Sequence, residues 1–255
     1  MKDMASFPPP TLSIITVCYQ AGSQIESTIQ SVMRQTYPHI EYIVVDGGST
    51  DETLSLIQKY AASITRWISE KDDGLYDAMN KGLRLCTGDY VLFLNAGDYL
   101  YDDHTIAHVF AACDQADVYY GEAMFVDALG RPVGLRSEVT PHRLPARLSW
   151  KDLKYGMVVS HQAFIVRRAL AASFDTRYRI CADIDWMITC LKQSQHICYT
   201  GQIISCFRMG GISKQHQLKA WKERYRILQQ HYGAIPNFFH HLWIAIRYLL
   251  SGRRY

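Results

Sequence analysis

The first hundred residues contain four short apolar segments, each followed by polar residues. The segments lie at residues 12–18, 41–46, 64–70 and 90–94, and helical patterns separate them. Apolar runs of this length that do not alternate with polar residues are typical of strands buried on both faces. The pattern therefore predicts an α/β fold with a mostly parallel central sheet and helices on both of its faces.

The stretches between these strands carry helix signals. Ser23 with Glu26, and Ser49 with Glu52, match the capping box that favours the start of a helix. Apolar residues at helical spacing follow both boxes, and a third helix is predicted over residues 75–86.

The second half of the chain is less regular. Strands are predicted at 118–126, 157–166 and 197–208, a helix at 183–193, and a polar connection without clear periodicity at 129–154. No linker rich in Gly, Ser or Pro separates the two halves. We therefore expect the second half to extend the same sheet instead of forming a separate domain.

The charge is divided unevenly along the chain. Of the 255 residues, 48% are hydrophobic and 20% charged, which is typical of a packed globular protein. Residues 1–207 hold 18 Lys and Arg against 23 Asp and Glu, whereas residues 208–255 hold 9 against 1. The expected organisation is a mildly acidic main domain at 1–213 and a basic tail at 214–255.

Several classes of protein are excluded or made less favourable. No apolar run reaches the ~20 residues of a membrane span, and the first ten residues lack the apolar core of a signal peptide. The sequence therefore predicts a cytoplasmic protein. The seven cysteines are widely spaced and contain no C-x-x-C pair. We expect buried free thiols, and neither a disulfide framework nor a structural zinc site.

Polar residues follow all four of the first strands, at 16–19, 46–51, 70–74 and 95–98. Because ligands of parallel sheets bind beyond the carboxyl ends of the strands, these residues predict a site for a nucleotide-type ligand. The first turn, CYQAGSQ, has a single glycine, which argues against a dinucleotide enzyme. The chain also lacks G-K-[ST], H-E-x-x-H and G-x-S-x-G motifs.

These strands with their polar ends resemble glycosyltransferase family 2, inverting enzymes of GT-A fold that use nucleotide sugars. The matching segments are SIITVCYQ (13–20), VVDGGSTDET (44–53), SEKDDGLYDAMNKGL (69–83), GDYVLFLNAGD (88–98), SHQAFIVRR (160–168), YRICADIDW (178–186) and FRMGGIS (207–213). The chain looks most like short bacterial enzymes of capsule, O-antigen or colanic-acid-type polysaccharide assembly. The resemblance implies a nucleotide-sugar donor, with UDP as the expected nucleotide.

The resemblance implies several contacts to this donor. Asp46 is expected to accept a hydrogen bond from the uracil base, with Thr16 and Tyr19 on the opposite wall. Asp73 with Gly74 is the preferred further donor contact. The structural alternatives are a turn-capping Asp46 and a core aromatic at Tyr19.

The resemblance also implies a divalent cation, Mg²⁺ or Mn²⁺, beside the donor diphosphate. The acidic motif of the family is Asn95-Ala96-Gly97-Asp98 here, so two of its usual acids are absent. By position, Asp98 is the expected metal ligand, and Asn95 is expected to bond the ribose or a metal-bound water. The alternative for Asp98 is a turn residue after a strand.

An inverting transfer needs one carboxylate on the acceptor side, which takes the acceptor proton as the hydroxyl attacks the anomeric carbon. The resemblance implies Asp183 as this base, with Asp185 as a neighbour that orients or stabilises. Ala182 stands where the family has Glu. The alternative for Asp183 is an acid that only stabilises the helix N-terminus.

Three more residues are expected at the site by resemblance. Asn80 is expected to reach the nucleotide or sugar phosphate, and His161 to lie near the acceptor. Arg208 is expected to start a loop, continued by residues 210–213, that closes over the donor phosphates. A buried structural histidine is the alternative for His161.

The basic tail is predicted to form two amphipathic helices, at about 214–231 and 237–251. The apolar stripe of the first consists of Leu218, Trp221, Tyr225 and Leu228. We expect this stripe to pack on the main domain. The second helix gathers Trp, Phe and Leu beside Arg and His, which is typical of a helix in an anionic membrane interface. Residues 237–255 are therefore expected to contact a membrane, with docking on the core as the alternative.

The sequence thus predicts a metal-dependent inverting glycosyltransferase that moves a sugar from a UDP-sugar to a saccharide acceptor. The acceptor is expected to be linked to a lipid at the inner face of the cell membrane, and no nucleic-acid partner is expected. A nucleotidylyltransferase is disfavoured because the first turn lacks a G-x-G-T-R-type loop. A non-catalytic sugar-nucleotide-binding or membrane-binding partner is the second alternative, because the motif at 95–98 lacks two of the family's usual acids and Ala182 replaces a Glu.

Overall fold

The first four strands form as the sequence predicts. The computed structural model describes residues 8–210 and 217–251, with side chains as far as residue 246. The strands are β1 (Leu12–Cys18), β2 (Ile40–Asp46), β3 (Arg66–Ser69) and β4 (Tyr90–Phe93). The helices between them are α1 (Gly22–Met33), α2 (Thr53–Lys59) and α3 (Leu75–Leu85). Every residue of β1 is buried, since the strand lies between β2 and β4.

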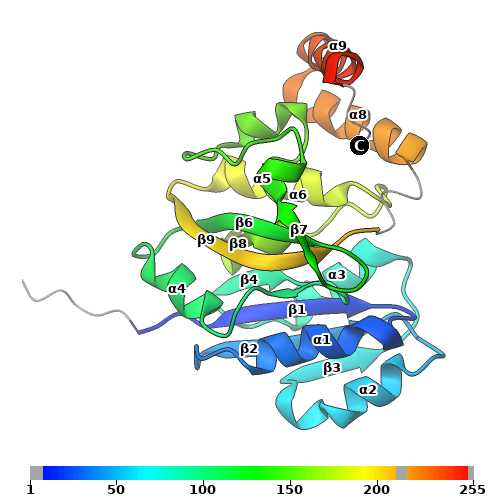
Figure 1. The fold of residues 1–255 in the computed structure, drawn as a ribbon, viewed down its shortest axis with the longest axis vertical. Helices are drawn as coiled ribbons and strands as arrows, with labels where there is room; N and C mark the ends of the chain where they lie inside the picture. The colour runs from blue at the N-terminus through cyan, green and yellow to red at the C-terminus, as the bar shows by residue number, and fades with distance from the viewer. Residues whose placement is uncertain (1–7, 211–216, 252–255) are drawn as a thin grey trace, which may run out of the picture.

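The order of these strands places the helices on opposite faces of the sheet. The strands lie in the order β3-β2-β1-β4 and are all parallel. Right-handed crossovers from β1 to β2 and from β2 to β3 put α1 and α2 on one face. The crossover to β4 runs in the reverse direction and puts α3 on the other face (Figure 1).

The second half continues the same sheet with mixed strand directions. Beyond β4 lie β8 (Phe164–Arg167), β6 (Val118–Val126), β9 (Ile197–Arg208) and β5 (Tyr99–Leu100), while β7 (Pro132–Leu135) pairs with β6. Of the eight strand pairings in the described part of the chain, four are parallel and four antiparallel. The predicted extension of one sheet is confirmed, but the parallel arrangement holds throughout only in the first four strands.

Short elements account for most differences from the sequence prediction. The strand predicted at 157–166 begins only at Phe164, after a 3₁₀ turn at His161–Ala163. β5 and the helix α4 (Thr105–Ala111) were not predicted, and the connection at 129–154 contains β7 and the short helix α5 (Arg136–Val139). The helix α6 (Ala182–Gln193) forms where it was expected.

The predicted capping boxes are wrong, although both helices form. α1 and α2 begin after Ala21 and Glu52, and neither residue makes a side-chain cap. Asp51 instead accepts hydrogen bonds from the backbone N–H groups of Gly22, at 3.1 Å, and of Thr53, at 3.0 Å. One carboxylate from the second turn therefore serves the first turns of both helices, which local sequence spacing does not reveal.

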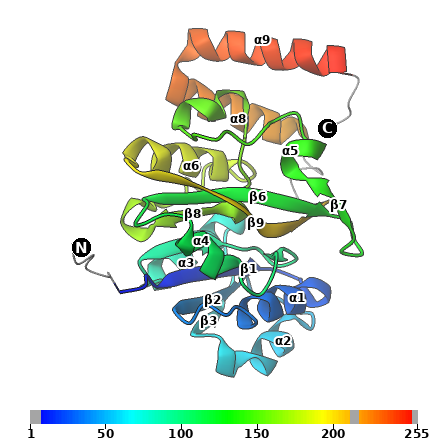
Figure 2. The ribbon, with the colours of Figure 1, turned by 60° about the vertical axis from the view of Figure 1, so that its left-hand side comes forward.

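The tail forms two helices on the outside of the molecule. α8 (Gln217–Tyr232) packs against α6, and α9 (Ala234–Ser251) lies over α8 as the outermost layer (Figure 2). The predicted stripe on the first helix is partly wrong, because Leu218 and Trp221 are exposed. The face that packs on the main domain instead carries Ala220, Glu223, Ile227 and Leu228.

The exposed side chains of α9 include large apolar residues: Ile235, Phe238, Phe239, Leu242, Trp243 and Ile246. Asn237 is buried against α8, where its Nδ2 donates to the Tyr225 carbonyl at 3.1 Å. None of the helices among the described residues is long and apolar enough to cross a bilayer. The side chains of Arg247, Leu249 and Leu250, and residues 252–255, lie outside the described part.

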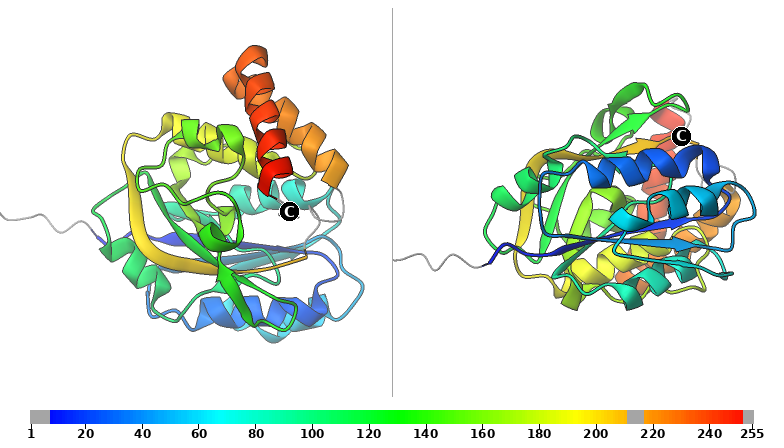
Figure 3. Two further views of the ribbon diagram at one scale, coloured as in Figure 1. Left: turned by 45° about the horizontal axis from the view of Figure 1, so that its top comes forward. Right: turned by 90° about the horizontal axis from the view of Figure 1, so that it is seen from below.

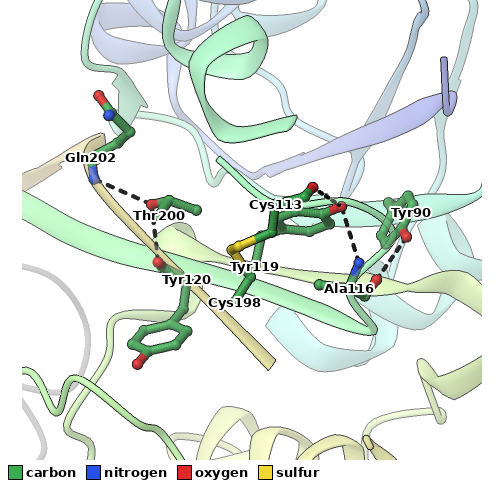
Figure 4. Close-up of a disulfide and its surroundings, with 8 residues drawn as sticks. All are labelled: Tyr90, Cys113, Ala116, Tyr119, Tyr120, Cys198, Thr200 and Gln202. Atoms are coloured by element: carbon green, nitrogen blue, oxygen red, sulfur yellow. Dashed lines mark hydrogen bonds between the residues drawn. A yellow bond between two sulfur atoms is a disulfide. The ribbon is translucent and has the colours of Figure 1, made fainter. Parts of the chain in front are cut away.

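A disulfide joins Cys113, which follows α4, to Cys198 on β9 (Figure 4). The prediction of free thiols is therefore wrong for this pair, whereas the other five cysteines are free and buried. β9 runs beside β6 in a register that sets Cys198 opposite Tyr119, and the Tyr119 hydroxyl donates to the Cys113 carbonyl at 3.2 Å. Because the two cysteines are 85 residues apart in sequence, their spacing carries no signal of the pairing.

Candidate active site

A cavity of about 670 Å³ opens at the carboxyl ends of β1, β3 and β4. The chain moves away from β1 to reach β3 and then returns to the other side of β1 at β4. The carboxyl ends of β1 and β4 therefore form the switch point at which open α/β sheets bind ligands. Seven of the predicted site residues line this cavity, namely Tyr19, Gly74, Asn95, Asp98, His161, Asp183 and Arg208.

His161 connects two walls of the cavity. Its Nδ1 lies 3.2 Å from Asp183 Oδ2, and its Nε2 lies 3.3 Å from Asn95 Nδ2. Because the Asn95 amide donates to Nε2, the neutral ring carries its proton on Nδ1 and donates it to Asp183. The ring thus joins the residue after β4 to the first turn of α6.

Asp183 is held in place by a second side chain. The Tyr76 hydroxyl lies 3.2 Å from Asp183 Oδ1 and 2.8 Å from the Ile180 carbonyl oxygen. Burial, together with the charge of Asp183, raises the pKa of Tyr76 well above its usual value, so this hydroxyl stays protonated and can donate. Asp183 lies in the first turn of α6, where a carboxylate also interacts favourably with the helix dipole.

Asp98 is buried, yet it lines the cavity. Its Oδ2 accepts from Gln162 Nε2 at 2.7 Å, and its Oδ1 accepts from the Arg208 backbone N–H at 3.0 Å. Burial raises the pKa of Asp98 to about 6, although both donors act to lower it. A cation bound beside this carboxylate would favour its charged form.

The turn between β4 and Asp98 requires glycine at position 97. Gly97 has φ +100, in the left-handed region, and a Cβ there would lie 2.6 Å from Gln24 Oε1. Its N–H donates to Thr28 Oγ1 at 3.0 Å, and its carbonyl accepts from Arg208 Nε at 3.3 Å. These bonds fix the turn that carries Asn95 and Asp98.

Two oxygen donors of this turn suit a hard divalent cation. Asn95 Oδ1 is buried without a hydrogen-bond partner, and Asp98 supplies a carboxylate. Mg²⁺ at phosphates is commonly held by one or two carboxylates plus phosphate oxygens and waters. Within the described residues, no three His, Cys, Asp or Glu side chains group into a metal site. The residues fit a cation that a bound diphosphate helps to hold, and not an all-protein metal cage.

Asp46 and Thr16 do not line the cavity. Asp46 is fully buried and accepts from the backbone N–H of Ser49, at 3.0 Å, and from Ser69 Oγ, at 2.6 Å. Thr16 is also fully buried, and its Oγ1 accepts from the Tyr42 hydroxyl at 3.1 Å. Asp46 therefore holds the turn after β2 against β3, while Tyr19, which is 63% exposed, lines the cavity.

Asp72 and Gly74, in the turn before α3, line the cavity. Asp73 lies between them in the chain, but it is exposed to solvent and does not line the cavity. The Gly74 N–H donates to Asp72 Oδ1 at 2.9 Å. Arg179 also lines the cavity and donates to the Asp73 carbonyl, so the predicted contact residue Asp73 supports a lining residue but does not line the cavity itself.

Asn80 and Asp185 also lie away from the cavity. Asn80 Nδ2 donates to the Phe174 carbonyl at 2.9 Å, and its Oδ1 accepts from the Phe174 N–H at 2.8 Å. Asp185 Oδ1 lies 2.7 Å from His231 Nε2 on α8. Each side chain therefore connects two parts of the fold.

Other residues that line the cavity were not predicted from the sequence, and they include Asp72, Tyr76, Gln162 and Arg179. These four lie inside the segments that carry the family resemblance, at 69–83, 160–168 and 178–186. That position was the available signal, since their residue types alone suggest no role. Of the predicted closing loop, Arg208 and Gly210 line the cavity, whereas residues 211–213 lie outside the described part.

Comparisons with known proteins identify the family of this chain. A model of the family "Glycosyl transferase family 2" matches residues 13–174. A PGL/p-HBAD biosynthesis glycosyltransferase of Mycobacterium bovis is 32% identical over 215 residues, which cover 80% of this chain and 79% of that relative.

Two solved glycosyltransferases share the fold at low identity. TarS 1–349 of S. aureus, also solved with UDP and with UDP-GlcNAc, has a TM-score of 0.66 at 20% identity, over 85% of this chain and 64% of that one. The mannosyltransferase PcManGT of Pyrobaculum calidifontis, solved with GDP-Man and Mn²⁺, has a TM-score of 0.60 at 18% identity, over 87% and 63%. This chain therefore spans less than two thirds of either structure. The match of residues 13–174 and the mycobacterial relative show that the chain belongs to glycosyltransferase family 2, and it is a glycosyltransferase of GT-A fold.

Proposed function

We propose that this glycosyltransferase moves a sugar from a UDP-sugar to a lipid-linked saccharide by an inverting, metal-assisted single displacement. The pathway would be bacterial surface polysaccharide biosynthesis. The observation that carries the proposal is the hydrogen-bonded series Asn95, His161 and Asp183 at the cavity wall. It supplies one oriented carboxylate beside a site suited to a diphosphate.

Asp183 is the proposed base. As the acceptor hydroxyl attacks the anomeric carbon, its proton passes to Asp183, a new C–O bond forms, and the bond from the anomeric carbon to the diphosphate breaks. UDP leaves with the electron pair, so the configuration at the anomeric carbon inverts. His161 and Tyr76 keep the carboxylate oriented through their hydrogen bonds.

Asp98 and Asn95 are the residues that would hold Mg²⁺ or Mn²⁺, which when bound neutralises charge on the leaving diphosphate. Gln162 and the Arg208 N–H orient the Asp98 carboxylate. Arg208 and Gly210 lie at the cavity rim, where a closing loop would contact the donor phosphates. The Mn²⁺ in the PcManGT structure supports a cation in this fold.

Tyr19, Asp72 and Gly74 are the proposed contacts to the donor, because they line the cavity at the ends of β1 and β3. Asp46 is proposed to act through the turn that it holds, and Thr16 through its hydrogen bond to Tyr42 on β2, since neither residue lines the cavity. The TarS complexes with UDP and UDP-GlcNAc support UDP as the donor nucleotide.

The tail at 214–255 is proposed to place the main domain, residues 1–213, on the inner face of the cell membrane. Its support is the exposed apolar surface of α9, including Phe239 and Trp243. Such a helix can lie in the bilayer interface with its rings among the lipid headgroups. This position would bring a lipid-linked acceptor to the cavity.

The test measures turnover of a panel of UDP-sugars with Mg²⁺ or Mn²⁺. The wild type should hydrolyse or transfer at least one donor, and Asp183→Asn should lower kcat by about 10²- to 10⁴-fold, as loss of a general base does, while UDP still binds. Asp185→Asn is the matched control from the same helical turn, because its partner is His231. Loss with Asp185→Asn alone would reassign the base, and wild type that binds UDP without turning over any donor would favour a non-catalytic role.

A further inference from the structure

A second cavity, of about 360 Å³, lies between α8 and the segment that precedes α6. One carboxylate, that of Glu223, and five cationic side chains line it. The cationic residues are Arg177, Arg179, Lys219, Lys222 and Arg226. We call this cavity the basic pocket. Its volume falls within the range of about 300–1,000 Å³ that is usual for ligand sites.

Glu223 fixes the walls of the pocket. It is buried, and its carboxylate accepts from the backbone N–H groups of Arg179 at 3.0 Å, Ile180 at 2.8 Å and Cys181 at 3.1 Å. These three bonds tie α8 to the segment before α6. The single acid of the pocket is therefore occupied by main-chain donors, and it forms no ion pair with the surrounding cations among the described residues.

Three of the cations form an array on one face of α8. Lys219, Lys222 and Arg226 are spaced by three and four residues, so their side chains lie along the same side of the helix. In the described part of the chain none of the three pairs with a carboxylate, whereas Arg177 pairs with Asp175 at 2.6 Å. Unpaired like charges repel one another, and a bound anion relieves that repulsion.

The basic pocket adjoins the acceptor side of the active site. Arg179 lines both cavities, and Ile180 and Asp183, which follow it in the chain, line the active-site cavity. α9 lies directly over α8 (Figure 3, left), so its exposed apolar surface belongs to the same part of the molecule. An anion in the pocket would therefore lie next to the active-site cavity, on the helix that also carries α9.

We propose that the basic pocket binds the phosphate or diphosphate that joins the acceptor saccharide to its lipid. This inference rests on the proposed lipid-linked acceptor and specifies its chemistry. Arg179 can bond phosphate oxygens with its planar guanidinium, while Lys219 and Lys222 act as point charges. The donor diphosphate would be bound through the cation that Asp98 and Asn95 would hold, so the two substrates would have separate phosphate sites.

The proposal is tested by titrating the full-length protein with farnesyl diphosphate and measuring the binding affinity by calorimetry. UDP and Mg²⁺ are present to occupy the donor site. The wild type should bind this probe, inorganic pyrophosphate should compete with it, and farnesol should not bind. Lys222→Gln with Arg226→Gln should weaken binding about tenfold, from the loss of two partly exposed charge contacts. Arg84→Gln, an exposed cation on α3, is the matched control and should bind as the wild type does.

Equal binding by the wild type and the double variant would overturn the proposal. The proposal would also be overturned if the double variant kept its affinity for farnesyl diphosphate but lost its binding to phosphatidylglycerol vesicles. The pocket would then bind the headgroups of the bilayer and not the acceptor phosphate. The affinity for UDP, measured on the same samples, reports folding. If the wild type fails to bind UDP, the proposed donor site fails, while the dependence of farnesyl diphosphate binding on Lys222 and Arg226 still decides the role of the basic pocket.

Discussion

At the scale of single residues, burial decides which polar groups are available for chemistry. Asp46 ends β2 and Asp98 follows β4. Asp46 was expected to contact the base of the donor, and Asp98 to hold the cation at its diphosphate. Asp46 is enclosed by Ser49 and Ser69, whereas Asp98 retains access to the cavity. A sequence pattern places both carboxylates near the ends of strands, but only packing determines which one faces a ligand.

The raised pKa of Asp98 gives a pH-dependent stability. A carboxyl whose folded pKa is about 6, above its unfolded value near 4, stabilises the fold below pH 4, and this contribution is lost as the pH rises through 6. Two pKa units correspond to about 3 kcal/mol. In EDTA, Asp98→Asn should therefore gain stability over the wild type between pH 4 and pH 7, measured by urea unfolding at each pH.

The same variant should lose metal-stimulated turnover, because the proposed cation loses its carboxylate. Gln162 can reverse its amide to accept from the side-chain N–H that the substitution introduces, so the fold should be retained. A stability difference that does not change with pH, or unchanged metal dependence of activity, would contradict the assignment of Asp98.

His161 is expected to act as a positioning residue for Asp183. His161→Ala should lower kcat by about 10- to 100-fold, because a misaligned base is a poor proton acceptor, with little change in the KM for the donor. His161→Asn keeps a side-chain N–H and should recover part of kcat. His39→Ala, an exposed histidine before β2, is the control. A loss confined to the donor KM would instead make His161 a donor contact.

At the scale of elements, the hydrophobic pattern of the sequence predicts long strands and helices better than short ones. β1, β6 and β9 have the predicted bounds, and each of these strands has seven residues or more. The two-residue β5 and the short α4 were not predicted, since such short elements contain too few repeats of a hydrophobic pattern to stand out.

The disulfide between Cys113 and Cys198 should stabilise the second half of the sheet. A cross-link over 85 residues restricts the unfolded chain, and loops of this size correspond to about 4.5 kcal/mol in the chain-entropy model. Dithiothreitol should therefore lower the urea midpoint of the wild type. Cys113→Ser with Cys198→Ser should unfold at the lower midpoint with or without the reductant. If the urea midpoint of the wild type were the same with and without dithiothreitol, the disulfide would add no stability.

At the scale of the whole molecule, the active-site cavity and the exposed apolar residues of the tail lie on different elements. The active-site cavity is formed by residues from the ends of β1, β3 and β4 and from α6, whereas the exposed apolar residues of the tail gather on α9. The basic last part of the sequence forms α8 and α9, which lie together at one end of the molecule (Figures 1 and 2).

Membrane contact through α9 can be tested without deleting the helix. Phe239→Ser with Trp243→Ser should weaken binding to phosphatidylglycerol vesicles at least tenfold, since burying each ring in the interface contributes roughly 1–3 kcal/mol. Both residues are exposed, so the fold should be unaffected. Leu129→Ser, on an equally exposed loop beside β7, is the control. Equal co-sedimentation of the double variant and the wild type with vesicles would rule out this surface of α9.

The sequence by itself determined the fold class, the first four strands and the edge of the sheet that carries the cavity. It could do so because burial on both faces of a strand leaves a continuous apolar run, and the polar residues after each run must lie at one edge. The tertiary structure decided which polar residues meet there. Asn95 and His161 are 66 positions apart, Asp183 lies 22 positions further on, and their contact depends on how α6 and the turn before β8 pack against β4. The pairing of Cys113 with Cys198 and the meeting of two chain segments at the basic pocket are likewise long-range contacts, which no local pattern encodes.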